Sequence, residues 1–449
     1  MVFAVLASAV IAQEGSWSVG GGGEIGTLWN FVPEEALAGE SAYNRYDYYG
    51  DVAGTFSLTY SRGDLSAGLG FNQRGKISAE VNYNNGDFAF SAKSNLSGLI
   101  QGDGFTEDDL GALWGYYKLL DGAIHIEAAV RSRANAFWAS NTAHNNAFDS
   151  KAAGGLGGVF ADVDGHNFLA VDFDLSSLVD GLSLGALVPD LFVSVGSHHE
   201  KWSPGTLGKG IGMDPWGGGF GTVFYPEGYT PGGGMDGYAY GLLGDAFSLS
   251  IFGAKYAAGP IDAAVQFALL GQNTADPEKL DSGLYFGLNF KINDQISAGA
   301  SIKGLFDGND SDGNQFAAGV SFSYGAGAFN ASIDAGLQFD AKGEPFEKGL
   351  IGIKPYISYS LVPEYLAISL GTFLFFALDS DLADNVGIGY EVTPELWFNV
   401  TGTGAGASYW AYGTGIILRY KLAGWTKDGA GNDHAPLINA FDITFKWSF

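Results

Sequence analysis

The segment FNASIDAGLQFD (329–340) decides the fold class, because apolar and polar residues alternate along it without interruption. One face of the segment carries Phe329, Ala331, Ile333, Ala335, Leu337 and Phe339. The opposite face carries Asn330, Ser332, Asp334, Gly336, Gln338 and Asp340. A period of two residues indicates a β-strand, and the contrast between its faces indicates that each face meets a different solvent.

The same alternation continues in both directions along the chain. IDAAVQFAL (261–269) and the segment 284–292 alternate as strictly. Similar segments occur near 17–31, 50–61, 63–71, 75–83, 86–96, 122–131, 166–175, 295–306, 315–324, 349–361, 384–392 and 408–421. Less regular segments occur around 110–120, 154–163, 181–197, 237–256, 364–377 and 394–401. Many have the roughly 9–11 residues that a tilted strand needs to cross a bilayer.

The connections between these segments are of two kinds. Short Asn-, Asp- and Gly-containing connections at 83–87, 292–295 and 323–329 are typical of hairpin turns. Longer polar or Gly-rich connections occur at about 32–49, 97–109, 132–153, 198–236 and 422–436. Short turns at one rim and long loops at the other are usual for a membrane barrel. We therefore predict an all-β fold, a single antiparallel transmembrane β-barrel of about 20 strands, with 16–22 allowed.

Composition supports a barrel over the alternatives. The chain of 449 residues contains 70 Gly and 14% aromatic residues, but only 16% charged residues. A soluble β-sandwich or β-helix would have to bury so many aromatic side chains in a narrow core. Beyond the N-terminus there is no apolar run long enough for a membrane-spanning helix. The net charge of −27 disfavours nucleic acid as a partner, and the absence of Cys excludes disulfides and thiolate metal sites.

The N-terminal run VFAVLASAVIA (2–12) has the length and small-residue ending of a signal peptide. No Lys or Arg precedes it, which departs from the usual pattern, and a buried first strand is the alternative. We predict a signal peptide at 1–12, cleaved after Ala12, and a barrel at 13–449.

The chain ends on INAFDITFKWSF (438–449), another alternating segment. Its apolar face carries Phe441, Ile443, Phe445, Trp447 and Phe449. This segment resembles the last strand of outer-membrane β-barrel proteins of diderm bacteria, including porins. The Gly-rich, aromatic and acidic composition is similar to that of spirochaete barrels. The resemblance implies a location in the bacterial outer membrane, contact with outer-membrane lipid, and recognition of the last strand by the barrel-assembly machinery.

Polar residues on the inward face are the best candidates for function. They are His125, Glu127, Arg131, Asp172, Asp174, Asp262, Gln266, Lys291, Lys303, Asp334, Gln338, Lys354, Arg419, Asp442 and Lys446. In a wet pore such residues set ion preference through the local potential. The alternative for each single residue is that it only hydrates the wall or pairs with a neighbour.

The segment 198–236 is the most distinctive connection and could narrow a channel or serve as a receptor surface. Its aromatic residues are candidates for sugar stacking or lipid contact, against ordinary packing within the loop. They are Trp202, Trp216, Phe220, Phe224, Tyr225 and Tyr229. His198 and His199 lack a spaced partner, so we predict no metal site. With no nucleophile motif or phosphate loop either, we predict no enzyme activity and no cofactor.

Three functions are compatible with a barrel of this kind. The first is a porin for passive diffusion of small hydrophilic solutes or ions, which prefers cations if the excess carboxylates line the lumen. The second is a surface-exposed adhesin, receptor or structural barrel with a narrow or plugged pore. The third is a transporter of hydrophobic compounds. Assembly into a homo-oligomer stays open.

Overall fold

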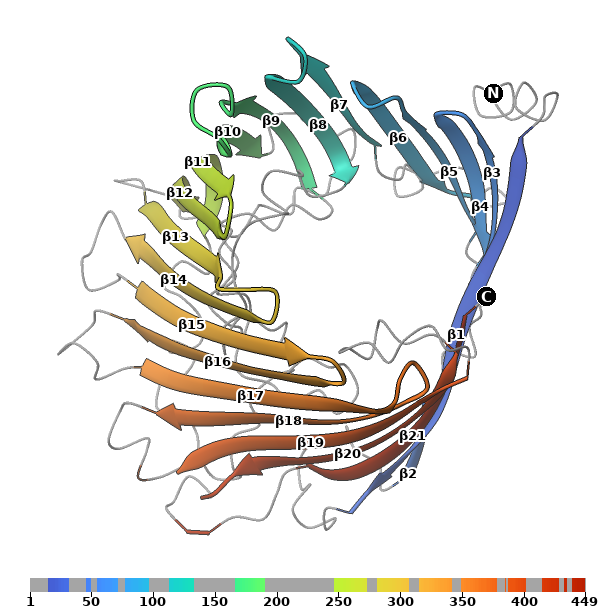
Figure 1. Cartoon of the computed structure of the whole chain (residues 1–449), viewed down its shortest axis with the longest axis vertical. Coiled ribbons are helices and arrows are strands. Elements are labelled where there is room, and N and C mark those ends of the chain that lie inside the picture. The colour runs from blue at the N-terminus through green and yellow to red at the C-terminus, as the bar shows by residue number, and fades with distance from the viewer. Residues whose placement is uncertain are drawn as a thin grey trace.

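The computed structural model forms one closed ring of antiparallel strands (Figure 1). It describes residues 15–31, 46–49, 55–71, 77–96, 113–132, 166–189, 246–272, 281–306, 315–340, 349–377, 384, 387–400, 414–427, 432–433 and 438–448. Among these residues, no helix is both long enough and apolar enough to cross a bilayer.

Twenty-one strands make up the ring. They are β1 (Ser16–Asn30), β2 (Tyr46–Tyr49), β3 (Thr55–Arg62), β4 (Leu65–Phe71), β5 (Ile77–Asn84), β6 (Phe88–Asn95), β7 (Leu113–Leu119), β8 (Ile124–Ser132), β9 (His166–Asp174), β10 (Leu182–Pro189), β11 (Ala246–Ala258), β12 (Ile261–Gln272), β13 (Asp281–Lys291), β14 (Ile296–Phe306), β15 (Gln315–Ala326), β16 (Phe329–Asp340), β17 (Gly349–Val362), β18 (Leu366–Ala377), β19 (Ile388–Asn399), β20 (Gly415–Trp425) and β21 (Ile438–Ser448).

The strands occupy 20 positions, because β2 and β3 share one. Both pair with β1, β3 with its first half (Ser16↔Ser61) and β2 with its second half (Trp29↔Tyr46). From β3 onward each strand pairs with the next, and β1 closes the ring by pairing with β21 from Gly22↔Ser448 to Asn30↔Ala440. The predicted closed antiparallel barrel of about 20 strands is confirmed.

The two faces of the wall differ as the alternation predicts. Large apolar side chains such as Ile302 and Val320 point outward and are 58% and 57% exposed. Side chains one residue away, such as Ser301 (5% exposed), point inward. The outward face therefore matches lipid, and the inward face holds the polar residues.

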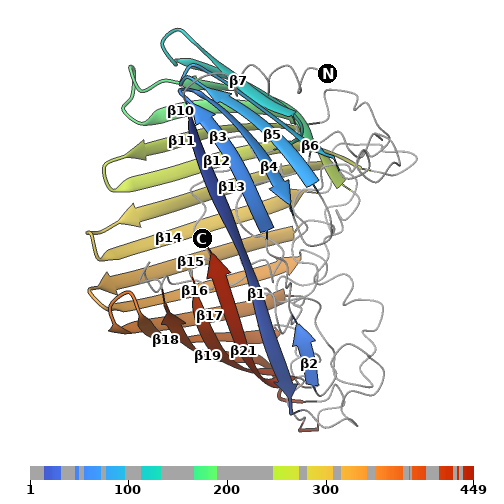
Figure 2. The same ribbon diagram turned by 90° about the vertical axis from the view of Figure 1, so that its right-hand side faces the viewer.

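The two rims also differ. Eight connections at one rim have seven residues or fewer, at 63–64, 85–87, 120–123, 175–181, 259–260, 292–295, 327–328 and 363–365 (left-hand side of Figure 2). Asn side chains shape two of them, because the Oδ1 atoms of Asn85 and Asn293 accept hydrogen bonds from backbone N–H groups that follow. The antiparallel order places the start of β1 and the end of β21 at this short-turn rim.

The structure differs from the sequence-based prediction in two assignments and at several strand ends; β20, for example, extends to Trp425, into the expected connection 422–436. β2 lies within 32–49, which we expected to be a connection. The segments 384–392 and 394–401 are one strand, β19, because Pro394 pairs with Leu370 of β18 and interrupts only the ladder to β20. The expected strand at 154–163, the signal peptide at 1–12 and the connection 198–236 lie outside the described residues.

Candidate functional site on the inner wall

The inner wall carries most of the predicted pore-lining residues. His125, Glu127, Asp172, Asp262, Gln266, Asp334, Lys354, Arg419, Asp442 and Lys446 lie at positions that alternate with outward apolar residues. Asp174 is exposed at the end of β9, and Lys291 at the end of β13 forms an exposed ion pair with Asp294 (2.8 Å). Arg131, Lys303 and Gln338 lie in β8, β14 and β16, but their side chains lie outside the described part of the structure.

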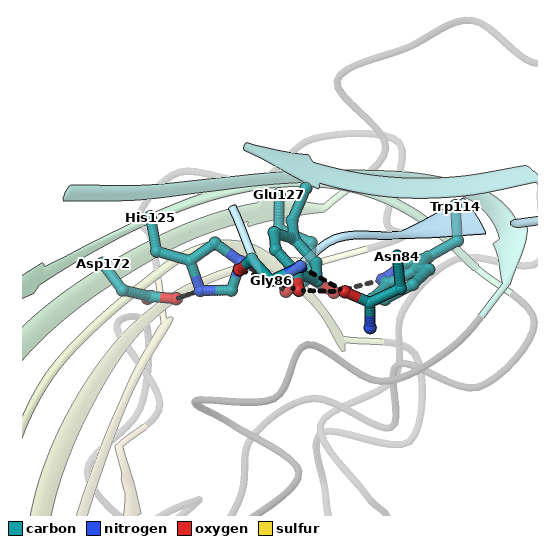
Figure 3. Close-up of polar contacts among 7 residues, drawn as sticks. Asn84, Gly86, Trp114, His125, Glu127 and Asp172 are labelled. Atoms are coloured by element: carbon teal, nitrogen blue, oxygen red, sulfur yellow. Dashed lines mark hydrogen bonds and ion pairs between the residues drawn. The ribbon is translucent and has the colours of Figure 1, made fainter. Parts of the chain in front are cut away.

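A histidine cluster lies on β7, β8 and β9 (Figure 3). The His125 ring lies between two carboxylates, with Nε2 3.8 Å from Glu127 Oε2 and Nδ1 3.8 Å from Asp172 Oδ2. The cross-strand register His125↔Asp172 causes the second contact. Glu127 is fully buried, and its Oε1 accepts a hydrogen bond from Trp114 Nε1 (2.5 Å).

Aromatic rings join this cluster to a turn at the rim. The Tyr116 ring packs edge-on against His125 (4.8 Å between centroids) and Trp114 (5.5 Å). The Tyr116 hydroxyl donates to Asn84 Oδ1 at 3.1 Å, next to the β5–β6 turn. Lys118 Nζ lies 5.5 Å from the centroid of the Tyr116 ring. The cluster is thus a fixed, mixed-charge patch rather than a row of separate charges.

A second charged patch lies on β19, β20 and β21. Arg419 faces Asp442 directly across β20 and β21 and donates to both of its carboxylate oxygens, from Nε (3.1 Å) and Nη2 (3.0 Å). Thr444 Oγ1 also donates to Asp442 (3.1 Å). On the other side of Arg419, the register partner is Glu395. This two-bond geometry is typical of strong Arg–carboxylate pairs.

The patch continues toward the opposite rim. Lys421 Nζ lies 3.1 Å from Glu391 Oε2, and both side chains are largely buried. Glu395 accepts hydrogen bonds from Trp397 Nε1 (2.8 Å) and from Ser369 Oγ (3.3 Å). Cations and carboxylates therefore alternate and neutralise one another along this part of the wall.

Between the two patches the wall is mainly small and neutral. Asp334 and Lys354 are direct register partners on β16 and β17, and Gln266 and Tyr285 are partners on β12 and β13. The fully buried Tyr285 lies along the wall over Gly287, where a Cβ would be 2.8 Å from the ring carbon Cζ. A larger residue at 287 would displace that ring.

The excess negative charge of the chain does not reside in the strands. Of the 49 acidic and 22 basic residues of the chain, 13 and 11 lie within the strand bounds. The eight short connections and the longer connection 400–414 at the same rim contain six carboxylates and no Lys or Arg; these are Asp64, Asp87, Asp121, Asp180, Asp294 and Glu364. The charges of the wall nearly cancel, so any strong electrostatic field arises at the rims.

Several residues of the two patches were absent from the predicted set. Lys421 lies two residues from Arg419, so the two-residue alternation alone could have placed it on the inward face. Glu391 and Glu395 were missed because the strand that carries them was split at Pro394. Trp114 and Tyr116 lie in a segment that alternates poorly, and no local signal connects them to His125.

The remaining predicted groups are placed as follows. On β21, Ile443 and Phe445 point outward, and Phe441 and Trp447 are partly exposed on the same face. Phe449 and the aromatic residues of 198–236 lie outside the described residues. Within the described ranges, no group of three or more His, Asp or Glu side chains is arranged to hold a metal ion.

No protein-family model matches the sequence, and no curated protein matches it. Similar solved structures include Pseudomonas aeruginosa OccK9 (OpdG), with 11% identity over 97% of this chain and 98% of that chain and a TM-score of 0.44. Pseudomonas aeruginosa OpdQ has 11% identity over 97% and 99% of the two chains and a TM-score of 0.44. A mutant of Rh. blastica porin has 9% identity over 97% and 100% and a TM-score of 0.35.

The architecture itself places the chain among membrane barrels. An even number of antiparallel strand positions, full closure, short turns at one rim and an apolar exterior are the features of outer-membrane barrels. The chain therefore has the outer-membrane β-barrel fold of porins and channels, and its location is the bacterial outer membrane.

Proposed function

We propose that the barrel is a channel for passive diffusion of small hydrophilic solutes and ions. The observation that carries the proposal is the inner wall, where Ser, Ala, Gly and paired charges predominate and only a few large side chains, such as Phe373 and Leu187, are buried. Such a wall can hydrate a passing solute, whereas a route for hydrophobic compounds needs a continuous apolar surface. Among the predicted pore-lining residues, those with partly exposed side chains, such as His125, Lys354 and Lys446, are the ones we expect a solute to contact.

We further propose a weak cation preference that originates at the rims. The carboxylates in the wall are largely balanced by Arg and Lys, so they add little net potential. Apart from Asp294, which pairs with Lys291, the carboxylates of the short-turn rim have no basic residue in the same turns, and they raise the local concentration of cations. Because these groups are at the surface, salt screens them and the preference should decline as ionic strength rises.

Single-channel recording in a planar bilayer tests both parts of the proposal. We expect stable nanosiemens-scale steps and a small cation-selective reversal potential across a tenfold salt gradient, smaller at molar than at millimolar salt. A folded barrel that inserts but conducts nothing would refute the diffusion function. An anion-selective reversal potential would refute the role of the rim carboxylates.

A further inference from the structure

A cavity of about 610 Å³ lies at the short-turn rim, on the inner side of β12 to β17. Its inward lining is rich in hydroxyl and amide groups. Ser297, Ser323, Ser332 and Tyr356 lie at consecutive register positions on four neighbouring strands, so their hydroxyls form a row across the wall. The outermost pair is already linked, since the Ser297 and Ser323 Oγ atoms are 2.6 Å apart.

Two amides extend this hydroxyl row. Asn289 lies on β13 two residues from Lys291, the register partner of Ser297, and Asn330 faces Gly325 across β15 and β16. A Cβ at residue 325 would lie 2.9 Å from Asn330 Oδ1, so the glycine leaves the space in which the amide lies. An amide carries both donors and an acceptor, which suits a ligand whose groups do the same.

The charged residues of the lining are few. Lys291 and Asp294 form an ion pair at the mouth (2.8 Å) and neutralise one another. The other charged residue is Asp262, the register partner of Asn289. Its Oδ1 is buried and accepts no hydrogen bond from any residue that the structure describes. A buried acceptor without a donor is costly, and a ligand O–H can supply the donor.

We propose that this cavity binds a small neutral polyhydroxylated solute, a sugar or polyol, during its passage through the channel. The inference rests on the proposed function, because the cavity opens on the inner side of the wall. An anion would meet the Asp262 carboxylate, and an apolar ligand would leave its buried Oδ1 without a donor. The volume falls within the roughly 300–1,000 Å³ of small-molecule sites, and the Tyr356 ring supplies the apolar surface such sites usually contain.

The test is equilibrium binding of maltose and sorbitol to the full chain, purified as a folded barrel in detergent. Calorimetry or saturation-transfer NMR would report the dissociation constant. Asp262→Ala removes the charged acceptor, and we expect it to weaken binding about tenfold or more. Ser332→Trp fills the cavity from the middle of the row and should abolish binding. Ser301→Ala, an inward serine outside the cavity, should leave the constant unchanged.

The outcomes are distinct. Saturable binding that both cavity variants weaken and Ser301→Ala does not would support the site. No binding of either probe, equal binding by all variants, or tighter binding of gluconate or phosphate would overturn it. Heat-modifiable gel migration confirms that each variant is folded. Potassium chloride conductance of the same preparations tests the proposed function separately, because a conducting barrel without sugar binding contradicts only the cavity inference.

Discussion

The Arg419–Asp442 pair offers the sharpest test of how the wall is stabilised. Both side chains are buried, with 7% and 3% of their surface exposed, and two hydrogen bonds join them across β20 and β21. Arg419→Met removes the guanidinium at similar length and leaves the Asp442 carboxylate with the hydrogen bond from Thr444. The variant therefore isolates the cost of a buried charge that has lost its counter-ion.

The expected loss is about 3–5 kcal/mol in the free energy of unfolding, the usual cost of breaking one side of a buried pair. Replacing both partners, as in Arg419→Met with Asp442→Leu, should recover part of that loss, because Asp442 no longer leaves an unpaired charge while Glu395 still loses the neighbouring guanidinium. The matched control is Lys291→Met. The Lys291–Asp294 pair has 62% and 96% of its side-chain surface exposed, so its removal should change stability by at most about 1 kcal/mol.

Reversible denaturant unfolding in lipid vesicles, followed by tryptophan fluorescence, would measure these differences. The reasoning fails if Arg419→Met and Lys291→Met are equally mild, because burial would then not determine the cost. It also fails if the double variant is as unstable as Arg419→Met alone.

Two further predictions concern the outer face and a turn. Val320→Arg places a charge on the lipid-facing side near the middle of β15 and should lower the free energy of unfolding by about 2–4 kcal/mol. The control Ser321→Arg, on the inner side, should lower it far less. Similar losses in both variants would contradict the assigned faces. Gly181 (φ +72°) and Gly122 (φ +92°) both adopt left-handed backbone, but a Cβ at 181 would also meet the backbone carbonyl of Ala257, while one at 122 meets open space. Gly181→Ala should therefore lower the unfolding midpoint clearly more than Gly122→Ala, beyond the roughly 1–2 kcal/mol that the conformation alone costs; equal effects would show that the contact is relieved easily.

The barrel was predictable because its decisive signal is local. Alternation in segments such as 261–269 and 329–340 fixes both the strand and the face, and β12 and β16 confirm these two segments. The β2 strand was missed since four residues are too few for a periodic signal. The strand β19 was predicted as two segments, 384–392 and 394–401, and Pro394 at their boundary lacks the N–H that a central strand needs on both sides. Only the cross-strand partners show that the hydrogen-bonded pairing with β18 continues through Pro394.

The site was predictable as a set but not as an arrangement. Period two placed Arg419 and Asp442 on the inner face, yet nothing local says that these two residues face one another. That pairing depends on the register between β20 and β21, which the connection 426–437 does not specify from its composition. The same holds for His125 and Asp172, which are separated by the connection 133–165. The near balance of charge in the wall was likewise hidden in the total of −27.

The pairing of β1 with β21 has a consequence for how the ring is made. Gly22 and Ser448 are partners although more than 400 residues separate them, whereas every other pairing joins strands that follow one another or, for β1 and β3, are separated by β2 alone. Chain-closure entropy grows only logarithmically, so this seam costs roughly 3 kcal/mol more to bring together than a ten-residue hairpin. This free-energy difference is small at equilibrium, but it determines the order in which the strand pairs form. The hairpins form early, and the β1–β21 seam forms last. Until it forms, the molecule is a curved sheet with two unpaired edges, and the lifetime of that sheet determines how much of the chain aggregates.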